Sequence, residues 1–303
     1  MNKKNVLIIG YGSIGRRHAE ILKKNKIIDK IYIFTSQNCN TFEKISNLSE
    51  IKKLDLSLII ICSRTIDHFK HLKYITDNVK NKTILVEKPL FNKIKKINLK
   101  NKNKIFTGYN LRLHPVIQFT KKYLKNKKVF FAGIYCHSYL PNWRENQRYH
   151  KSNTAIKKYG GGVLLELSHE IDYLQWLFNK IIKINSVSTN RISNLKIDVE
   201  DYAVITGKTK KINFLLDLNF FSKIYQRCII IYGFDFTMKC DLIKNEIFII
   251  KKNKKKIINF KTFQNYTYDL EHKLILSNNT NSLCDFSQGL QIVKIIDKIR
   301  KFK

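Results

Sequence analysis

The stretch NVLIIGYGSIGRRHAE, residues 5–20, sets the expected fold of the first part of this chain. Its apolar run VLII predicts a buried strand, and the residues from 13 to about 24 predict a helix. The intervening glycines form the pattern G-x-G-x-x-G in a strand–turn–helix context, which makes the pattern informative. Such a turn lets backbone N–H groups approach a pyrophosphate at the start of the helix. The candidate cofactor-binding residues of this turn are Gly10, Gly12, Ser13, Ile14 and Gly15.

The pattern around this turn predicts an α/β fold with a doubly wound parallel sheet. Continuous apolar runs such as LSLIIIC are typical of strands covered on both faces, and helix-length segments separate them. After Pro115 the alternation of predicted strands and helices gives way to successive strand-like runs with short turns. These runs predict a second, α+β domain with a mainly antiparallel sheet. The predicted strands of the first part are 5–10, 31–34, 56–62, 83–87 and 104–110.

Two domains are expected from the length of 303 residues. We predict a dinucleotide-binding domain over 1–115 and a substrate-binding and oligomerisation domain over 116–303, whose C-terminal helix is free to pack back toward the first domain. An uncovered apolar sheet face is unfavourable in a monomer, so a homodimer or homotetramer through the second sheet is expected.

The composition excludes several other classes of protein. The 57 basic and 23 acidic residues give a net charge of +34, but the lysines occur in every segment, so a nucleic-acid partner is not expected. The six cysteines show no metal-ligand spacing and are expected to be buried reduced thiols, with no metal site. No run is long enough for a membrane span or a signal peptide, and a cytoplasmic protein is expected.

The end of the second predicted strand bears on the choice between NAD and NADP. An acidic residue there would bind the adenosine ribose of NAD, but IYIFTSQN has none, and Ser36 lies at this place. A neutral hydroxyl does not repel a 2′-phosphate, and Arg16 or Arg17 could approach one. Either dinucleotide is therefore consistent with the sequence.

The segment VEKPL, residues 86–90, closes an apolar strand with a charged pair and a proline. In a doubly wound sheet, ligands bind beyond the carboxyl ends of the strands, where Glu87 and Lys88 lie. Ser63 and His68 follow the preceding strand at the same edge, and we include all four residues among the cofactor contacts. A lysine beside the nicotinamide can exchange a proton with a substrate hydroxyl, whereas the plain structural alternative is an ion pair at a strand end.

The segment GGGVLLELSHEIDYLQWL, residues 160–177, predicts a helix with a histidine between carboxylates. Glu166, His169 and Asp172 are spaced by three, so one helical face would carry all of them. A histidine beside a carboxylate can serve as a general base in an oriented tautomer. The alternative is a boundary histidine between two surface acids.

Together these segments resemble the Gfo/Idh/MocA family, which includes glucose–fructose oxidoreductase and inositol dehydrogenase. The resemblance runs nearly end to end and includes GYGSIGRRH, CSRTIDH, VEKP, GYNLRLHP and GGGVLLELSHEID. It implies a Rossmann domain, an open-faced sheet domain and NAD(P)-dependent sugar redox chemistry with proton transfer by Lys88 and His169. The family commonly has an aspartate four residues before the histidine. Here Leu165 holds that position, which leaves the role of Glu166 open.

The expected substrate is a sugar-type small molecule, either neutral or anionic. A loop at 138–152 combines an aromatic ring for stacking with guanidinium groups for phosphate or carboxylate, similar to members linked to bacterial surface glycans. The candidate substrate contacts are Asn110, Arg112, His114, Trp143, Arg144 and Arg148. The leading hypothesis is hydride transfer to or from a sugar, sugar acid or nucleotide sugar. The alternatives are NAD-dependent glycoside hydrolysis by transient oxidation and a non-catalytic dinucleotide-binding sensor.

Overall fold

The computed structural model describes residues 3–99, 101–144 and 148–302 of the chain. The chain forms two compact units, and the last helix crosses from one to the other. Unit 1 comprises Met1–Asn110 with Asn265–Lys294, and unit 2 comprises Leu111–Gln264 with Ile295–Lys303.

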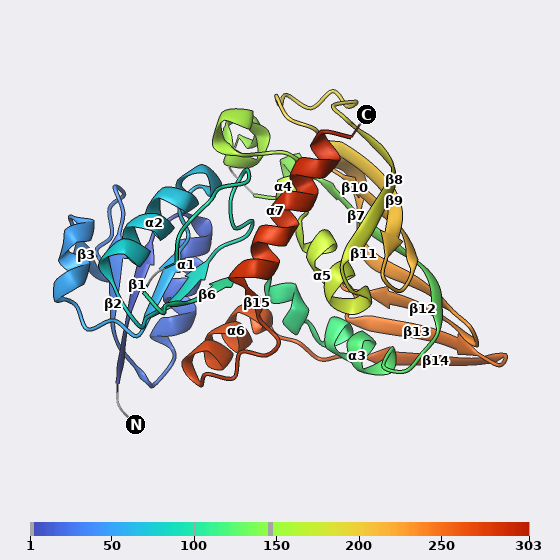
Figure 1. Ribbon diagram of the computed structural model, residues 1–303, viewed down its shortest axis with the longest axis horizontal. Coiled ribbons are helices and arrows are strands. Elements are labelled where there is room, and N and C mark those ends of the chain that lie inside the picture. The colour runs from blue at the N-terminus through green and yellow to red at the C-terminus, as the bar shows by residue number, and fades with distance from the viewer. Residues whose placement is uncertain (1–2, 100, 145–147, 303) are drawn as a thin grey trace. The chain divides into compact units, whose positions relative to one another are not determined.

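Unit 1 is built on a parallel sheet whose strand order is β3-β2-β1-β4-β5-β6, extended at one edge by the antiparallel β15 (Figure 1). This order is that of the doubly wound dinucleotide-binding fold, and it confirms the predicted architecture. The chain passes to the other half of the sheet after β3, so the strand order reverses between the neighbouring strands β1 and β4. The strands are β1 (Lys4–Ile9), β2 (Ile28–Phe34), β3 (Glu43–Ile45), β4 (Leu58–Ile61), β5 (Thr83–Val86), β6 (Lys104–Thr107) and β15 (Cys284–Asp285).

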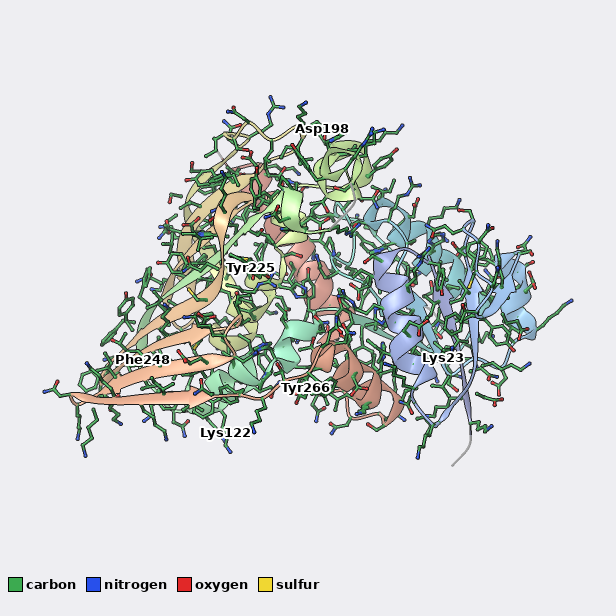
Figure 2. All side chains as sticks on the ribbon, turned by 180° about the vertical axis from the view of Figure 1, so that it is seen from behind. Lys23, Lys122, Asp198, Tyr225, Phe248 and Tyr266 are labelled. Atoms are coloured by element: carbon green, nitrogen blue, oxygen red, sulfur yellow. The ribbon has the colours of Figure 1, made fainter. Side chains whose placement is uncertain are left out.

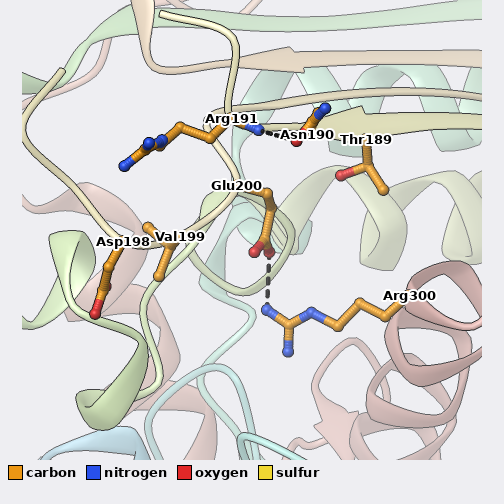
Figure 3. A pocket seen from close by; sticks show the side chains of 7 residues that line it. All are labelled: Thr189, Asn190, Arg191, Asp198, Val199, Glu200 and Arg300. Atoms are coloured by element: carbon orange, nitrogen blue, oxygen red, sulfur yellow. Dashed lines mark hydrogen bonds and ion pairs between the residues drawn. The ribbon is translucent and has the colours of Figure 1, made fainter. Parts of the chain in front are cut away.

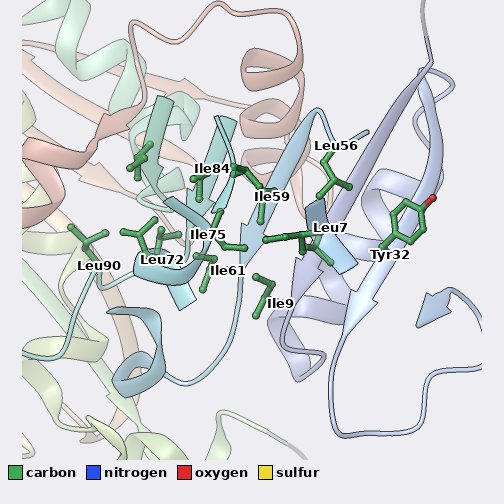
Figure 4. Close-up of a cluster of buried hydrophobic side chains, with 14 of the residues drawn as sticks. Leu7, Ile9, Tyr32, Leu56, Ile59, Ile61, Leu72, Ile75, Ile84 and Leu90 are labelled. Atoms are coloured by element: carbon green, nitrogen blue, oxygen red, sulfur yellow. The ribbon is translucent and has the colours of Figure 1, made fainter. Parts of the chain in front are cut away.

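Helices cover the sheet because its strands are apolar on both sides. All four residues of β4 are buried, and a cluster of side chains including Ile59, Ile61 and Leu72 packs between sheet and helices (Figure 4). The helices of unit 1 are α1 (Ser13–Lys23), α2 (His68–Asn78), α6 (Tyr266–Leu276) and the first part of α7 (Phe286–Arg300), with 3-10 turns at Leu48–Lys53 and Thr65–Asp67. A further 3-10 turn, Asn110–Leu113, contains the boundary between the units.

Unit 2 contains an eight-stranded sheet of order β14-β13-β12-β11-β7-β10-β9-β8. Neighbouring strands are antiparallel except β7 and β10, which are parallel. The mainly antiparallel sheet expected after Pro115 is thus confirmed. Its strands are β7 (Val129–Tyr139), β8 (Ile181–Asn190), β9 (Tyr202–Thr209), β10 (Asn213–Asn219), β11 (Phe221–Gly233), β12 (Phe236–Asp241), β13 (Glu246–Lys251) and β14 (Lys254–Asn259).

The helices of unit 2 lie against one face of this sheet (Figure 1). On β7, Ile134 and Cys136 face the helices and are buried, whereas Phe131 and Tyr135 on the other face are part-exposed. The helical segments are α3 (Pro115–Tyr123), α4 (Val163–Glu166) and α5 (His169–Phe178), with 3-10 turns at Leu140–Asn142, Tyr149–Lys151, Asn153–Ala155 and Lys157–Tyr159.

One predicted helix differs from the observed structure. The segment expected to run unbroken from about 164 to 178 forms two helices, α4 and α5, separated at Leu167 and Ser168. Leu167 departs from helical geometry with φ −96° and ψ 32°. Glu166 and His169 therefore do not share one continuous helical face, although His169 and Asp172 both lie on α5.

The positive charge of the chain is distributed over both units. Side chains ending in nitrogen project from helices, strands and turns alike (Figure 2). Among the described residues, no helix is both long and apolar enough to cross a membrane.

Candidate active site

The glycine turn after β1 lies at the switch point of the strand order, beside the carboxyl end of β4. Gly10 has a φ of 95°, which favours glycine, and a Cβ there would lie 2.7 Å from the amide nitrogen of Ser63. A Cβ on Gly15 would overlap the carbonyl oxygen of Gly10. A Cβ on Gly12 would meet no described atom within 4 Å. Two glycines are thus required by packing, whereas Gly12 leaves open space above the turn.

The amino-terminal end of α1 fits an anionic group. The N-cap residue, Gly12, has no side chain to accept a hydrogen bond from the first N–H groups of the helix, and the first turn carries no acidic residue. The first backbone N–H groups of a helix lack intrahelical acceptors, and the helix dipole favours negative charge there. These features match the pyrophosphate of a dinucleotide, which the backbone of Gly12, Ser13 and Ile14 would hold.

The end of β2 carries neutral side chains, as the sequence predicts. Ser36 is exposed, and the hydroxyl of Thr35 accepts a hydrogen bond from the amide of Gln37 at 3.1 Å. Arg16 lies over the ring of Tyr11 and donates to Gln37 Oε1 at 3.3 Å. A guanidinium group therefore stands beside the residues expected to face the adenosine ribose.

At the end of β5, Glu87 is buried while Lys88 is partly exposed. The Glu87 carboxylate accepts one hydrogen bond from the amide of Lys88 at 3.1 Å and another from His18 Nε2 at 2.9 Å. Burial by itself raises the pKa of Glu87, but His18 and Lys88 together outweigh burial, and the pKa is lowered below its usual value. The Lys88–Pro89 peptide bond is cis. A buried carboxylate and a reachable lysine thus share the carboxyl edge of the sheet.

The end of β4 carries Ser63 and His68. The Ser63 hydroxyl forms a hydrogen bond with His71 Nδ1 at 2.8 Å. The buried His68 ring lies 2.9 Å from the carbonyl oxygen of Ser63 and 3.0 Å from that of Pro89, so it connects the ends of β4 and β5. Burial lowers the pKa of His68, although the carbonyl acceptors at both ring nitrogens oppose this effect.

In unit 2, α5 is fixed by two ion pairs, one buried and one part-buried. Asp172 accepts a bidentate pair of hydrogen bonds from Arg112, at 2.9 Å from Nε and 2.6 Å from Nη2. Glu170 accepts from Arg227 Nε at 2.7 Å. Such pairs are costly to break, because a lone charge would remain buried. They hold the helix on which His169 lies, so Arg112 and Asp172 have a positioning role in addition to any contact with substrate.

The other candidate substrate contacts occupy different environments. Asn110 is buried, and His114 Nδ1 accepts from the amide of Val116 at the start of α3, while burial lowers the pKa of His114 to about 4. Trp143 packs edge-on against Phe220 yet remains 38% exposed. Arg144 and Arg148 are exposed, whereas residues 145–147 of the same loop lie outside the described residues.

The glycine triplet before α4 lies beside a pocket of unit 2. Gly162 has a φ of 109°, and a Cβ there would collide with the Glu200 carboxylate. Glu200 in turn pairs with Arg300 at 2.8 Å (Figure 3). The pocket has a volume of about 430 Å³, and its lining residues are Thr189, Asn190, Arg191, Asp198, Val199, Glu200 and Arg300. Thr154 donates to Glu166 at 3.1 Å on the other side of the triplet.

Two structural features of the site were not predicted from sequence. His18 contacts the side chain of Glu87, and Glu200 packs against Gly162. His18 could have been found by its position, because it lies three residues after Gly15 on the buried face of α1. No group of potential metal ligands occurs among the residues that the structure describes.

Several solved structures share this fold over nearly the whole chain. A UDP-N-acetylglucosamine 3-dehydrogenase, GnnA from Acidithiobacillus ferrooxidans, matches with a TM-score of 0.78 at 14% identity, covering 99% of this chain and 97% of that one. WlbA dehydrogenase from Bordetella pertussis, solved with NADH and UDP-GlcNAcA, matches with a TM-score of 0.77 at 14% identity and coverages of 99% and 96%. A levoglucosan dehydrogenase, solved with NADH and levoglucosan, gives a TM-score of 0.82 at 14% identity and coverages of 99% and 97%.

No curated protein sequence matches this chain. Two family models do match it. The model described as an oxidoreductase family with an NAD-binding Rossmann fold matches residues 4–104, and the model of the GFO/IDH/MocA C-terminal domain matches residues 131–237. The first range contains β1 to β5 of unit 1, and the second contains most of β7 and all of β8 to β11 of unit 2. The chain therefore belongs to the Gfo/Idh/MocA family and is an NAD-binding oxidoreductase.

Proposed function

We propose that this oxidoreductase transfers a hydride between C4 of a nicotinamide and a carbon bearing a hydroxyl or carbonyl group on a nucleotide sugar. In the oxidative direction, the substrate carbon gives up a hydride to C4, the hydroxyl gives up its proton to the amine of Lys88, and a carbonyl forms. In the reductive direction, the Lys88 ammonium returns the proton to the developing alkoxide.

The position of Lys88 is the observation that carries this proposal. It leaves the sheet at the carboxyl end of β5, on the edge where β1 carries the glycine turn. In a doubly wound fold, bound nucleotides lie along this edge. Glu87 provides a negative charge beside the lysine and fixes its backbone amide. A proton-exchanging group therefore lies where the redox-active end of a dinucleotide is expected.

The catalytic roles in unit 2 are proposed from chemistry and position on α5. His169 begins this helix, and the imidazole is suited to assist proton transfer. Asp172 lies one turn further along and is held by Arg112, so it would orient the helix that carries the imidazole. Glu166 remains a candidate for orienting the histidine through the turn that separates α4 from α5.

Cofactor binding is proposed to involve residues 1–115, with contacts from the glycine turn and from Ser36, Ser63, His68, Glu87 and Lys88. Both NAD and NADP are chemically compatible with the end of β2. The neutral Ser36 does not repel a 2′-phosphate, and Arg16 stands nearby to pair with one. A comparison of the affinities for NADH and NADPH would distinguish the two cofactors.

A nucleotide sugar is favoured over a neutral sugar by the charge of the candidate substrate loop. Trp143 presents a part-exposed ring, and Arg144 and Arg148 are exposed. An aromatic ring can stack on a sugar or base, and guanidinium groups pair with phosphate. The relatives solved with UDP-GlcNAcA show that this fold accommodates a nucleotide sugar in those proteins.

The proposal is tested by incubating the protein with NAD⁺ or NADP⁺ and UDP-N-acetylglucosamine, UDP-GlcNAcA or levoglucosan. A rise of the reduced-nicotinamide absorbance with a UDP-sugar is expected. Oxidation of levoglucosan alone would contradict the nucleotide-sugar assignment. Glycoside cleavage without net reduction of the dinucleotide would instead support hydrolysis by transient oxidation, and binding of NADH without turnover of any sugar would support a sensor.

We further propose that the open face of the unit 2 sheet forms a homodimer or homotetramer and that the protein acts in the cytoplasm. Tyr232 is 46% exposed and contacts Phe131, and Ile230 and Phe248 add part-exposed apolar groups on the same face. Exposed apolar groups gathered on one sheet face are unfavourable in water. A second copy of the chain would cover it with an identical surface.

Replacing Tyr232 by lysine is expected to convert the assembly into monomers, because a charge would be buried without a partner. Light scattering coupled to size-exclusion chromatography measures the mass of each species. Ile192, which is 58% exposed and lies in the turn after β8, provides a matched lysine substitution that should leave the mass unchanged. A monomeric native protein would refute the proposed assembly.

A further inference from the structure

His18 lies in a buried polar cluster of unit 1 to which the proposed chemistry assigns no role. It belongs to α1, and its side chain is fully buried. Its Nε2 lies 2.9 Å from Glu87 Oε1, and its Nδ1 lies 2.7 Å from His272 Nε2 on α6. The other oxygen of Glu87 accepts the hydrogen bond from the amide of Lys88. An unbroken series of hydrogen bonds therefore joins α6, α1 and the end of β5.

The protons in this series can be assigned from the environment of each group. Burial and the neighbouring His18 lower the pKa of His272 well below its usual value, so this ring is neutral. Glu87 is held as the anion, with its pKa lowered by hydrogen bonding from His18. An anionic carboxylate only accepts hydrogen bonds. The hydrogen atom in this contact is therefore on His18 Nε2, and the N–H group donates the hydrogen bond to Glu87.

The surrounding groups do not replace this donor. Glu271 on α6 is buried and Cys62 after β4 is part-buried, and desolvation raises the pKa of each well above its usual value, so both are uncharged. Burial likewise raises the pKa of Tyr268, whose ring packs edge-on against His18. Arg17 lies over the Tyr268 ring on the same helix as His18. Among the described residues, His18 is the side chain that donates a hydrogen bond to the Glu87 carboxylate.

We propose that His18, backed by His272, is a positioning residue that keeps Glu87 as a carboxylate, which holds the backbone amide of Lys88 and places a negative charge beside this residue. This inference rests on the proposed role of Lys88 in proton transfer. Without the His18 donor, a buried carboxylate becomes neutral, and Lys88 loses the negative charge beside it. Loss of an adjacent negative charge favours the free amine of a lysine over its ammonium form.

Two substitutions of His18 separate the contact made by Nε2 from the contact made by Nδ1. In His18→Gln the amide nitrogen reaches about as far as Nε2 and can still donate to Glu87. In His18→Asn the shorter amide replaces only Nδ1, so it can contact His272 but not Glu87. Both side chains are polar, and neither can carry a charge. Glu87→Gln provides the reference in which the negative charge is removed directly.

The measurement is the rate at which acetic anhydride acetylates Lys88 at neutral pH, quantified by mass spectrometry of the peptide. His18→Asn and Glu87→Gln are expected to raise this rate about three- to tenfold, because an adjacent opposite charge shifts protonation by about one unit or less at a part-exposed site. His18→Gln should stay within twofold of the native rate. The double variant H18N/E87Q should show no further increase over Glu87→Gln.

Thr76→Val serves as the control for the loss of a buried hydrogen bond elsewhere in unit 1, where Thr76 donates to the carbonyl of Leu72. Its acetylation rate at Lys88 should equal that of the native protein. Equal rates in folded His18→Asn and native protein, alongside a raised rate in Glu87→Gln, would overturn the inference. Because the readout requires no turnover, a raised rate in His18→Asn would support the positioning role even if Lys88 proved dispensable for hydride transfer.

Discussion

Replacing Lys88 by methionine is expected to lower turnover of the UDP-sugar substrate by a factor of about 10² or more, the scale of general acid–base catalysis. Methionine retains much of the length and apolar surface of the lysine stem but cannot exchange a proton. Lys88 follows β5 and has its backbone amide held by Glu87, so the substitution should leave the sheet intact. Initial rates of nicotinamide reduction measure the effect, and NADH affinity should change much less than turnover.

A nearby lysine provides the matched control for this experiment. Lys93 is exposed and lies beyond the end of β5, so Lys93→Met removes one positive charge from the same region. Its turnover should equal that of the native protein. Full activity in Lys88→Met would show that another group exchanges the proton with the substrate.

Replacing Gly12 by alanine is expected to weaken NADH binding by about 10²-fold without destabilising the protein. The backbone at Gly12 has a φ of −75°, which alanine adopts readily, and the added Cβ meets no described atom within 4 Å. In the bound state, however, that space is where the pyrophosphate approaches the N–H groups of α1. Losing one or two charge-assisted hydrogen bonds costs about 3 kcal/mol, which corresponds to about 10² in affinity.

Gly15→Ala distinguishes this effect from a loss of fold. A Cβ on Gly15 would overlap the carbonyl oxygen of Gly10, so this variant should unfold at a lower temperature. Fluorescence titration with NADH and a thermal melt of each variant provide the comparison. Native affinity in Gly12→Ala would place the pyrophosphate away from this turn, and a lowered melting temperature would mean that Gly12 is structural.

The sequence was most informative where local pattern and burial agree. Continuous apolar runs such as LIII at Leu58–Ile61 predict buried parallel strands, and the glycine spacing predicts the turn, because both signals depend on neighbouring residues. The two-residue strand β15 and the parallel pairing of β10 with β7 depend on segments far apart in the chain. No local periodicity encodes such contacts.

The candidate site shows the same division. The positions of Glu87 and Lys88 at a strand end follow from the sequence. The hydrogen-bond partners do not, because Glu87 is paired with His18 on α1 and Asp172 is paired with Arg112. The sequence does not predict the break between α4 and α5, because Leu164, Leu167 and Ile171 keep the apolar spacing of a continuous helix across it. Tertiary contacts there override a helical pattern that is locally acceptable.

The central claim is that the nicotinamide lies beside Lys88 when a dinucleotide occupies the glycine turn. The most direct measurement is the distance from Lys88 Nζ to nicotinamide C4 in a crystal structure of the protein with NADH. We predict a separation of about 4–6 Å, which leaves room for a substrate carbon and oxygen at reacting distances of about 3–3.5 Å. A nicotinamide more than about 10 Å from Lys88, with the pyrophosphate at the turn, would contradict the account.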